Sequence, residues 1–241
     1  MTLIKRAGFL DHLEEFRRRL LVSLLAVGLF SVVALFFSKH LIDFLILPLS
    51  RLDLASQDLY FTAPYEAFVV HLKASLLTGF LAASPVMFSQ LWLFVAPGLH
   101  RRERRIVLPL TLASVFLFLA GAAFAFWAVV PAGLQFLLGF QTSSIQPLLG
   151  IDPYFSFLTG MILACGILFD LPVVVLGLVQ AGVLGAAALR SARKGVIVSV
   201  FFAAAVLTPS PDPVGQIFLA LPILVLYEGC VFVAKWFEKK Q

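Results

Sequence analysis

Residues 155–179 read FSFLTGMILACGILFDLPVVVLGLV, a run of 25 residues that contains one charged side chain, Asp170. A helix rises about 1.5 Å per residue, so about 20 apolar residues cross the roughly 30 Å hydrocarbon core of a bilayer. Apolar runs recur along the chain at 20–37, 74–96, 106–130, 155–179, 195–207 and 214–234. The sequence therefore predicts an all-α integral membrane protein with six transmembrane helices in one polytopic domain, residues 1–241.

The composition excludes an ordinary soluble domain. Hydrophobic residues make up 61% of the chain and the mean hydropathy is +1.02, whereas about half of a soluble domain is apolar. Alternating apolar and polar strands of about 10 residues are absent from the sequence, which argues against a membrane barrel. The first apolar run is too long for a cleavable signal peptide and lacks a small-residue cleavage site.

The sequence carries no signature of a metal or nucleotide site. His, Cys and carboxylate residues do not cluster at metal-ligand spacings, and there is no Walker sequence or Gly-rich phosphate loop. Cys165 and Cys230 lie inside apolar runs, and we interpret them as small buried hydrophobic residues. We therefore expect no cofactor, no metal and no nucleotide hydrolysis by this chain alone.

The distribution of positive charge predicts the orientation in the membrane. Of the 18 Lys and Arg residues, 15 lie on one side of the alternating apolar runs, and the other side has only Lys39, Arg51 and Lys73. Positive residues near the ends of spans stay in the cytoplasm, so both termini are predicted to be cytoplasmic. Because these charges cluster at span ends, the expected partner of the basic surface is anionic membrane lipid and not nucleic acid.

The last two apolar runs are unusual. Residues 195–207 would cover only about 20 Å as a helix, and the run is followed by TPSPDP at 208–213. The sixth run, 214–234, contains the ionisable Glu228 about 15 residues after the TPSPDP turn. Two interpretations remain open: short spans that require local bilayer thinning or helix association, or an ordinary hairpin whose flanking side chains reach the interface.

The connections and prolines add further expectations. The segment 41–49, which contains Pro48, is predicted to form a short helix along the membrane interface. Pro85, Pro109, Pro172 and Pro222 lie inside apolar runs and are predicted to bend or locally open their helices.

Two clusters of charge precede spans on the cytoplasmic side. In DHLEEFRRR at 11–19, Asp11 and Glu15 share a helix face, as do Glu14 and Arg18. In RRERR at 101–105, Glu103 is the lone acid, and four arginines keep its carboxylate ionised. Each cluster is either a solvated, internally paired surface or a receiver for an incoming cation, and a carboxylate fits a guanidinium in a bidentate way that Lys cannot copy.

Polar residues inside the apolar runs form another set of candidates. Asp170 is a functional candidate because an intramembrane carboxylate is costly; the alternative is a structural hydrogen bond near the helix opened by Pro172. Gln90 and Gln216 are candidate interhelical hydrogen-bonding residues. Glu66 is predicted to lie at the external mouth of the second span.

Taken together, these residues resemble the TatC family, the large polytopic subunit of the twin-arginine protein translocase, from about residue 10 to 235. The pieces that carry the resemblance are HLEEFR at 12–17, FTAPYEAF at 61–68, Pro85, QLWLFVAPGL at 90–99, Glu103 with Arg104, FDLP at 169–172, TPSPDP at 208–213, Gln216 and LYE at 226–228. Each piece is weak alone, but their order on this topology is specific.

The resemblance implies a fold and a function. The six helices would form a cupped, glove-like bundle with short fifth and sixth spans, in the cytoplasmic (inner) membrane. The family binds signal peptides that carry consecutive arginines on folded precursor proteins, and two cytoplasmic glutamates of the family match Glu15 and Glu103. It implies export driven by the proton gradient, single-span TatA/TatB-type partner subunits and an oligomer of receptor complexes. Asp170 matches a polar position where the family usually has Glu.

The resemblance also assigns roles to individual residues. The expected signal-peptide-binding residues are Glu15, Glu103, Glu14, His12, Arg17 and Arg104, with Arg17 and the basic loop holding the acids in place. Asp170, Gln90 and Gln216 would weaken the bilayer locally, and the external loop would cap the cup. The expected loop and structural residues are Pro48, Phe61, Pro64, Glu66, Phe68, Pro85, Phe94, Pro209 and Asp212.

Two other function classes compete with a translocase receptor. A secondary transporter for a small solute needs a midplane site and usually paired broken helices from repeats, and Asp170 alone is a poor site of that kind. An intramembrane enzyme needs a nucleophile with a base, or a metal, yet all four His residues lie outside the predicted apolar runs. The leading hypothesis is therefore a protein translocase subunit and not an enzyme.

Overall fold

The computed structural model describes residues 2–50, 59–95, 107–139, 148–180, 186–207 and 213–238. Nearly all of these residues are helical. The elements in chain order are α1 (Thr2–Phe36), α2 (Ser38–Ser50), α3 (Glu66–Val95), α4 (Val107–Phe124), the π-helical turn η3 (Ala125–Val129), α5 (Val130–Leu138), α6 (Ile151–Gln180), α7 (Ala186–Leu207) and α8 (Pro213–Glu238).

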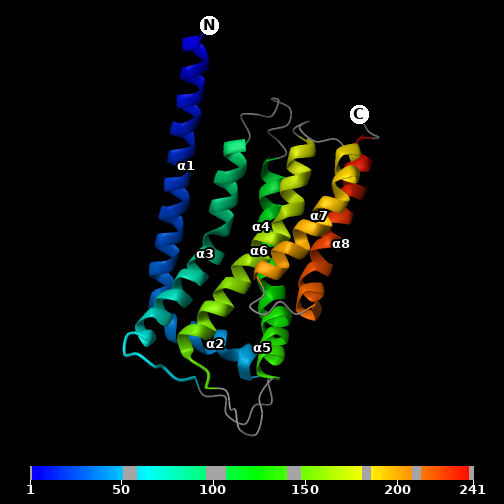
Figure 1. The fold of residues 1–241 in the computed structure, drawn as a ribbon. Coiled ribbons are helices and arrows are strands. Elements are labelled where there is room, and N and C mark those ends of the chain that lie inside the picture. Colours follow the sequence, from blue (N-terminus) through cyan, green and yellow to red (C-terminus); the bar gives the residue numbers. More distant parts are fainter. Residues whose placement is uncertain are drawn as a thin grey trace.

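The long helices run alternately up and down, and the N- and C-terminal ends of the chain lie at the same end of the bundle (Figure 1). The helices α4, η3 and α5 together make one pass, and the short helix α2 lies across the opposite end. The chain therefore makes six passes, and both termini lie at one end, as the alternating apolar runs predict. The all-α fold class predicted from the sequence is confirmed, and segment 41–49 is helical as predicted, within α2.

Within the described residues, four passes are long and apolar enough to cross a membrane: His12–Phe36, Glu66–Val95, Val107–Leu138 and Ile151–Val179. The last two helices differ from these. In α8 the apolar stretch is the shorter Ala220–Phe232, and in Figure 1 the α7–α8 hairpin stops short of the end reached by α5 and α6. The short fifth and sixth spans are therefore confirmed. The helix α7 has 22 residues and begins at Ala186. It therefore contains the apolar run 195–207 and a more polar segment before it.

Prolines are accommodated in two ways. The helices α3, α6 and α8 continue through Pro85, Pro172 and Pro222, and α3 and α6 visibly change direction along their length (Figure 1). Pro131, near the start of α5, follows the π-helical turn η3. A proline removes one backbone donor and clashes with the carbonyl four residues earlier, so the wider turn, closed by the Val130 N–H on the Ala125 carbonyl, makes room for it.

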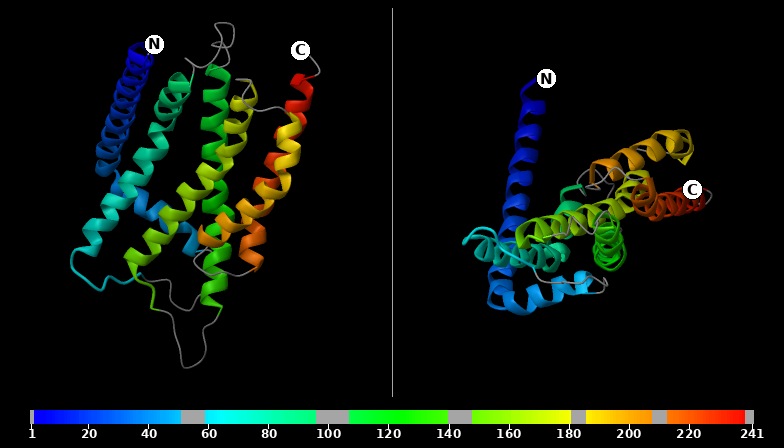
Figure 2. Two further views of the ribbon diagram at one scale, coloured as in Figure 1. Left: turned by 45° about the horizontal axis from the view of Figure 1, so that its top comes forward. Right: turned by 60° about the horizontal axis from the view of Figure 1, so that its bottom comes forward.

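Glycines allow two helix pairs to approach closely. A Cβ atom on Gly79 of α3 would lie 2.6 Å from the Cα of Ser31 in α1, and one on Gly121 of α4 would lie 2.7 Å from the Cys165 carbonyl in α6. Small residues at helix contacts are the usual way to bring membrane helices together, because apolar side chains gain little by leaving lipid. Almost none of the α1 span is buried, so α1 is held mainly by its contact with α3 (Figure 2).

Candidate functional site

Residues 12–19 of α1 lie beside the C-terminal end of α3, toward the end of the bundle that holds both termini (Figure 1). The α1–α3 contact brings Glu15 and Arg19 of α1 next to Gln90 of α3, although Arg19 and Gln90 are 71 residues apart in the sequence. The site is therefore built by one helix–helix contact, the same contact in which Gly79 of α3 closely approaches Ser31 of α1.

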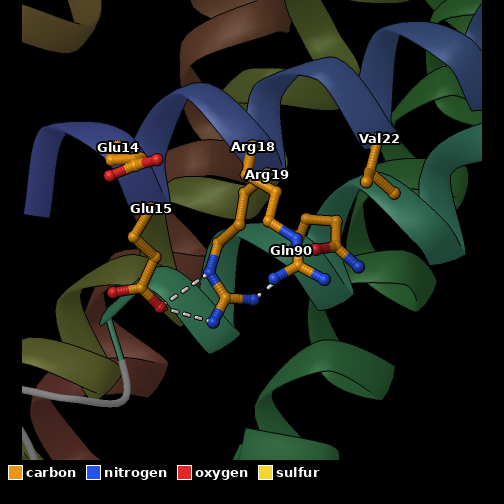
Figure 3. A pocket seen from close by; sticks show the side chains of 6 residues that line it. All are labelled: Glu14, Glu15, Arg18, Arg19, Val22 and Gln90. Carbon is orange, nitrogen blue, oxygen red and sulfur yellow. Dashed lines mark hydrogen bonds and ion pairs between the residues drawn. The ribbon is translucent and has the colours of Figure 1, made fainter. Parts of the chain in front are cut away.

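The Glu15 carboxylate is bound by a guanidinium of its own chain. Arg19 donates to Glu15 Oε1 from Nε at 3.0 Å and from a terminal nitrogen at 2.5 Å, and its other terminal nitrogen donates to Gln90 Oε1 at 3.5 Å. Figure 3 shows Arg19 lying between Glu15 and Gln90. The two charged side chains are only partly covered, with 23% of Arg19 and 30% of Glu15 exposed. Glu15 therefore remains accessible from outside the bundle.

An open pocket of about 680 Å³ adjoins this ion pair. Two acids and two arginines face it from α1, together with one apolar side chain and the amide from α3. The lining residues are Glu14, Glu15, Arg18, Arg19, Val22 and Gln90. A pocket with both signs of charge can bind a cation at its carboxylates only in exchange with, or alongside, its own arginines.

Aromatic side chains extend the site toward the N-terminal end of α1. The His12 ring stacks on Phe94 of α3, with ring centroids 4.4 Å apart and an interplanar angle of 17°. Phe16 packs edge-to-face with the same Phe94 ring, with ring centroids 5.5 Å apart. The Nδ1 atom of His12 lies 4.0 Å from Glu15 Oε2. His12, Glu15 and Phe94 were all singled out from the sequence, and the structure brings them together.

Sequence reasoning missed the residue that contacts Glu15 most closely. It assigned the role of holding the acids to Arg17 and the basic loop residues. In the described residues, the arginine that pairs with Glu15 is Arg19, and Arg17 is exposed. The spacing rule for helix faces would have found it, because Glu15 and Arg19 are four residues apart. Gln90, expected as an interhelical hydrogen-bonding residue, lines the pocket beside this pair and accepts a hydrogen bond from Arg19 of α1. Four other predicted site residues, Glu103, Arg104, Pro209 and Asp212, lie outside the described part of the chain.

Asp170 occupies a separate, buried position on α6. Only 5% of the residue is exposed, and its Oδ1 atom has no hydrogen-bond partner within the described residues. Its polar neighbour is Ser114 of α4, whose hydroxyl accepts a hydrogen bond from the indole of Trp92 in α3. Asp170 therefore lies inside the contact of three helices and does not line the Glu15 pocket. Gln216 lies at the start of α8.

The opposite end of the bundle contains the predicted loop residues. Glu66, the first residue of α3, is buried and accepts hydrogen bonds from the Thr62 backbone at 2.9 Å and the Thr62 hydroxyl at 2.6 Å. The backbone of Tyr60 pairs with that of Leu149 and Ile151. This pairing ties the end of the α2–α3 connection, which includes Pro64, to the start of α6. Phe61 and Phe68 are 62% and 66% exposed.

The α7–α8 hairpin is fastened at the end that holds the termini. Arg193 donates to Glu228 at 2.7 Å, and the Tyr227 hydroxyl donates to the Leu189 carbonyl at 2.8 Å. The thiol of Cys230 lies 3.4 Å from the Pro172 carbonyl of α6. Cys165 and Cys230 are both free and buried, as expected. Among the described residues there is no group of His, Cys, Asp and Glu that could hold a metal ion.

Comparison with known proteins gives a consistent result. The sequence model of the family described as Sec-independent protein translocase protein (TatC) matches residues 11–222. The TatC protein of Desulforapulum autotrophicum is 41% identical over 98% of this chain and 87% of its own length. The protein of Aquifex aeolicus is 37% identical over 96% of both chains. The chloroplastic protein of Arabidopsis thaliana is 41% identical over 96% of this chain and 67% of its own.

Solved structures agree with the sequence relatives. The crystal structure described as "Twin Arginine Translocase Receptor- TatC in DDM" superposes with a TM-score of 0.80 at 37% identity, covering 92% of this chain and 99% of that chain. A second crystal structure of the same kind of receptor gives a TM-score of 0.78 at 38% identity. Sequence and fold thus point to the same group of proteins over nearly the whole chain, and the protein belongs to the TatC family of Sec-independent protein translocase proteins.

Proposed function

We propose that this chain is the receptor subunit that binds twin-arginine signal peptides on folded precursor proteins and starts assembly of an export complex. The observation that carries the proposal is the Glu15 carboxylate, partly exposed at the edge of an open pocket and already bound to a guanidinium. A site that holds one guanidinium at a carboxylate has the chemistry to hold another. Membership in a protein translocase family displaces the small-solute transporter alternative.

The chemistry favours arginine over lysine. A guanidinium is planar and offers paired N–H groups that match the two oxygens of a carboxylate, whereas an ammonium is a compact point charge. Glu15 supplies one carboxylate, with Glu14 lining the same pocket. We assign the second carboxylate to Glu103, in a loop with four arginines. Arg104 and the neighbouring basic residues would contact the lipid surface.

The rest of the proposal concerns partners and placement. The chain would work without catalysis of its own, in the cytoplasmic membrane, with TatA/TatB-type single-span subunits and further copies of the receptor complex, and with transport driven by the proton gradient. Both termini would be cytoplasmic, because 15 of the 18 Lys and Arg residues lie in the sequence on the side of the apolar runs that also holds the termini. Asp170 and Gln216 would weaken the bilayer next to the short α7–α8 hairpin.

Peptide binding tests the central claim. Purified protein in nanodiscs is titrated with an Arg-Arg signal peptide and with its Lys-Lys counterpart. The native chain is expected to prefer Arg-Arg. Glu15→Gln and Glu103→Gln should each weaken Arg-Arg binding about tenfold or more, because each loses a charge-assisted contact of about 1.5–3 kcal/mol.

A matched carboxylate at the other end of the bundle serves as control. Asp43 is exposed on α2, so Asp43→Asn removes one negative charge far from the pocket and should leave both affinities unchanged. If the native chain binds both peptides alike, or if neither glutamate variant weakens binding, this chain is not the arginine reader.

Labelling from one side of the membrane tests the orientation. In a background without Cys165 and Cys230, single cysteines are introduced as Lys194→Cys and Asp43→Cys, at two exposed positions. An impermeant maleimide added to intact cells should label only the Asp43→Cys chain, and permeabilised cells should allow both to react. The reverse pattern would place the termini outside the cytoplasm.

A further inference from the structure

The carboxylate proposed to receive a signal arginine is occupied by Arg19. Two donors of Arg19, Nε and one terminal nitrogen, bind the same atom, Glu15 Oε1, at 3.0 and 2.5 Å. This is the chemistry that an incoming arginine would use, supplied one helical turn away on the same chain. Arg18 also lines the pocket, so it serves as a control arginine of the same charge beside Arg19.

We propose that Arg19 is an internal competitor for the arginines of the signal peptide, holding Glu15 in the resting state and giving way when the peptide binds. The inference rests on the proposed function of this same site. A bidentate guanidinium needs both carboxylate oxygens, and Arg19 already uses Oε1 twice. The Oε2 atom is approached by His12 Nδ1 at 4.0 Å. An incoming guanidinium therefore binds in the fork geometry only if Arg19 moves.

When Arg19 is displaced from Glu15, other polar groups of the pocket can pair with it. Its remaining terminal nitrogen already contacts Gln90 Oε1 at 3.5 Å, a distance that can shorten. Glu14 lines the same pocket and offers a second carboxylate. With 23% of the side chain exposed, Arg19 also keeps contact with solvent during the exchange. The exchange therefore replaces one pairing by another without leaving a buried charge alone.

The expected size of the effect follows from the exposure of the pair. Partly exposed ion pairs one helical turn apart are weak, with couplings of a few tenths to about 1 kcal/mol. A competitor of that strength lowers the apparent affinity for the peptide by about two- to sixfold. A residue that merely positions Glu15 would act in the opposite direction, because its removal would weaken peptide binding. The sign of the change separates the two roles.

The test compares Arg19→Gln, Arg19→Lys and Arg18→Gln in the nanodisc titration with the Arg-Arg peptide. Arg19→Gln should bind about two- to sixfold more tightly than the native chain. Arg19→Lys keeps the charge but loses the planar fork, so its affinity should lie between the two. Arg18→Gln removes one positive charge from the same pocket and measures the gain from reduced repulsion alone, which should be smaller than the gain from Arg19→Gln.

A second background isolates the competition at Glu15. Because the competition requires the carboxylate, Arg19→Gln should give no more gain than Arg18→Gln when Glu15→Gln is present. The proposal is overturned if Arg19→Gln binds no more tightly than the native chain, or if Arg18→Gln gains as much. It is also overturned if the gain persists without Glu15. Absence of Arg-Arg binding by the native chain overturns the proposed function and this inference together, whereas binding that depends on Glu15 without a gain in Arg19→Gln overturns the inference alone.

Discussion

The indole N–H of Trp92 donates a hydrogen bond to the hydroxyl of Ser114 at 2.9 Å, and both side chains are buried. Trp92 belongs to α3, Ser114 to α4, and Ser114 neighbours Asp170 of α6. Trp92 follows Gln90 by two residues, so this bond joins α4 to the same turn of α3 that contributes Gln90 to the Glu15 pocket. A buried polar contact thus joins three helices close to the proposed site.

Removing the acceptor of this bond should destabilise the bundle. Ser114→Ala leaves the buried indole N–H without its partner, which costs about 1–3 kcal/mol. We expect a lower unfolding temperature for the purified protein in detergent. In the Trp92→Phe background, the same Ser114→Ala change should cost less, because no indole donor remains. Equal costs in both backgrounds would show that the bond contributes no stability.

The close approach of α1 and α3 should control the pocket geometry. A Cβ on Gly79 would lie 2.5 Å from the Ser31 backbone nitrogen, so Gly79→Ala must push α1 away from α3. Overpacking of this kind costs about 1–3 kcal/mol, and separation of Glu15 from Gln90 should weaken Arg-Arg peptide binding.

Gly160 is the matched control for Gly79, because nothing lies within 4 Å of a Cβ at that position in α6. Gly160→Ala should be neutral, or stabilising by up to about 1 kcal/mol through its higher helix propensity. Similar thermal stability and peptide affinity for Gly79→Ala and Gly160→Ala would contradict the assigned role of the α1–α3 contact.

The described part of the α2–α3 connection should depend on Glu66. Glu66→Ala removes the acceptor for both the backbone N–H and the hydroxyl of Thr62, and hydrogen bonds to a charged group contribute about 1.5–3 kcal/mol. Amides at 59–65 should then exchange with solvent faster, as measured by hydrogen–deuterium exchange. Glu66→Gln keeps one acceptor and should have an intermediate effect. Unchanged exchange in Glu66→Ala would mean that this connection is held by other contacts.

Two contacts between α7 and α8 should differ in their contribution to stability. The Arg193 and Glu228 side chains are 42% and 55% exposed, and exposed ion pairs contribute about 0–1 kcal/mol. The Tyr227 hydroxyl bonds the Leu189 carbonyl in a buried setting, where one hydrogen bond contributes about 0.5–1.5 kcal/mol. Tyr227→Phe should therefore lower the unfolding temperature more than Glu228→Gln. A larger drop in unfolding temperature for Glu228→Gln would show that the ion pair contributes more to the α7–α8 contact.

Several features were predictable because they depend on local properties of the chain. The described parts of the apolar runs are helical, since an apolar run satisfies its backbone polar groups in lipid only as a helix. The polar extension of α7 before residue 195 was not predictable from hydropathy, which reports only the apolar part of a helix. The π-helical turn at Ala125–Val129 also went unpredicted, although Pro131 was the signal for it.

The sequence by itself determined the class of the protein, the number of passes, the short last pair of spans and the charged residues at one end. All of these follow from the composition of contiguous segments, through the cost of placing charge and unpaired backbone in lipid. Only the tertiary structure decided which side chains meet. Arg19 reaches Gln90 because α1 packs on α3, and Asp170 faces Ser114 because α4 packs on α6. Such contacts join residues far apart in the chain, and they depend on helix packing that no single segment encodes.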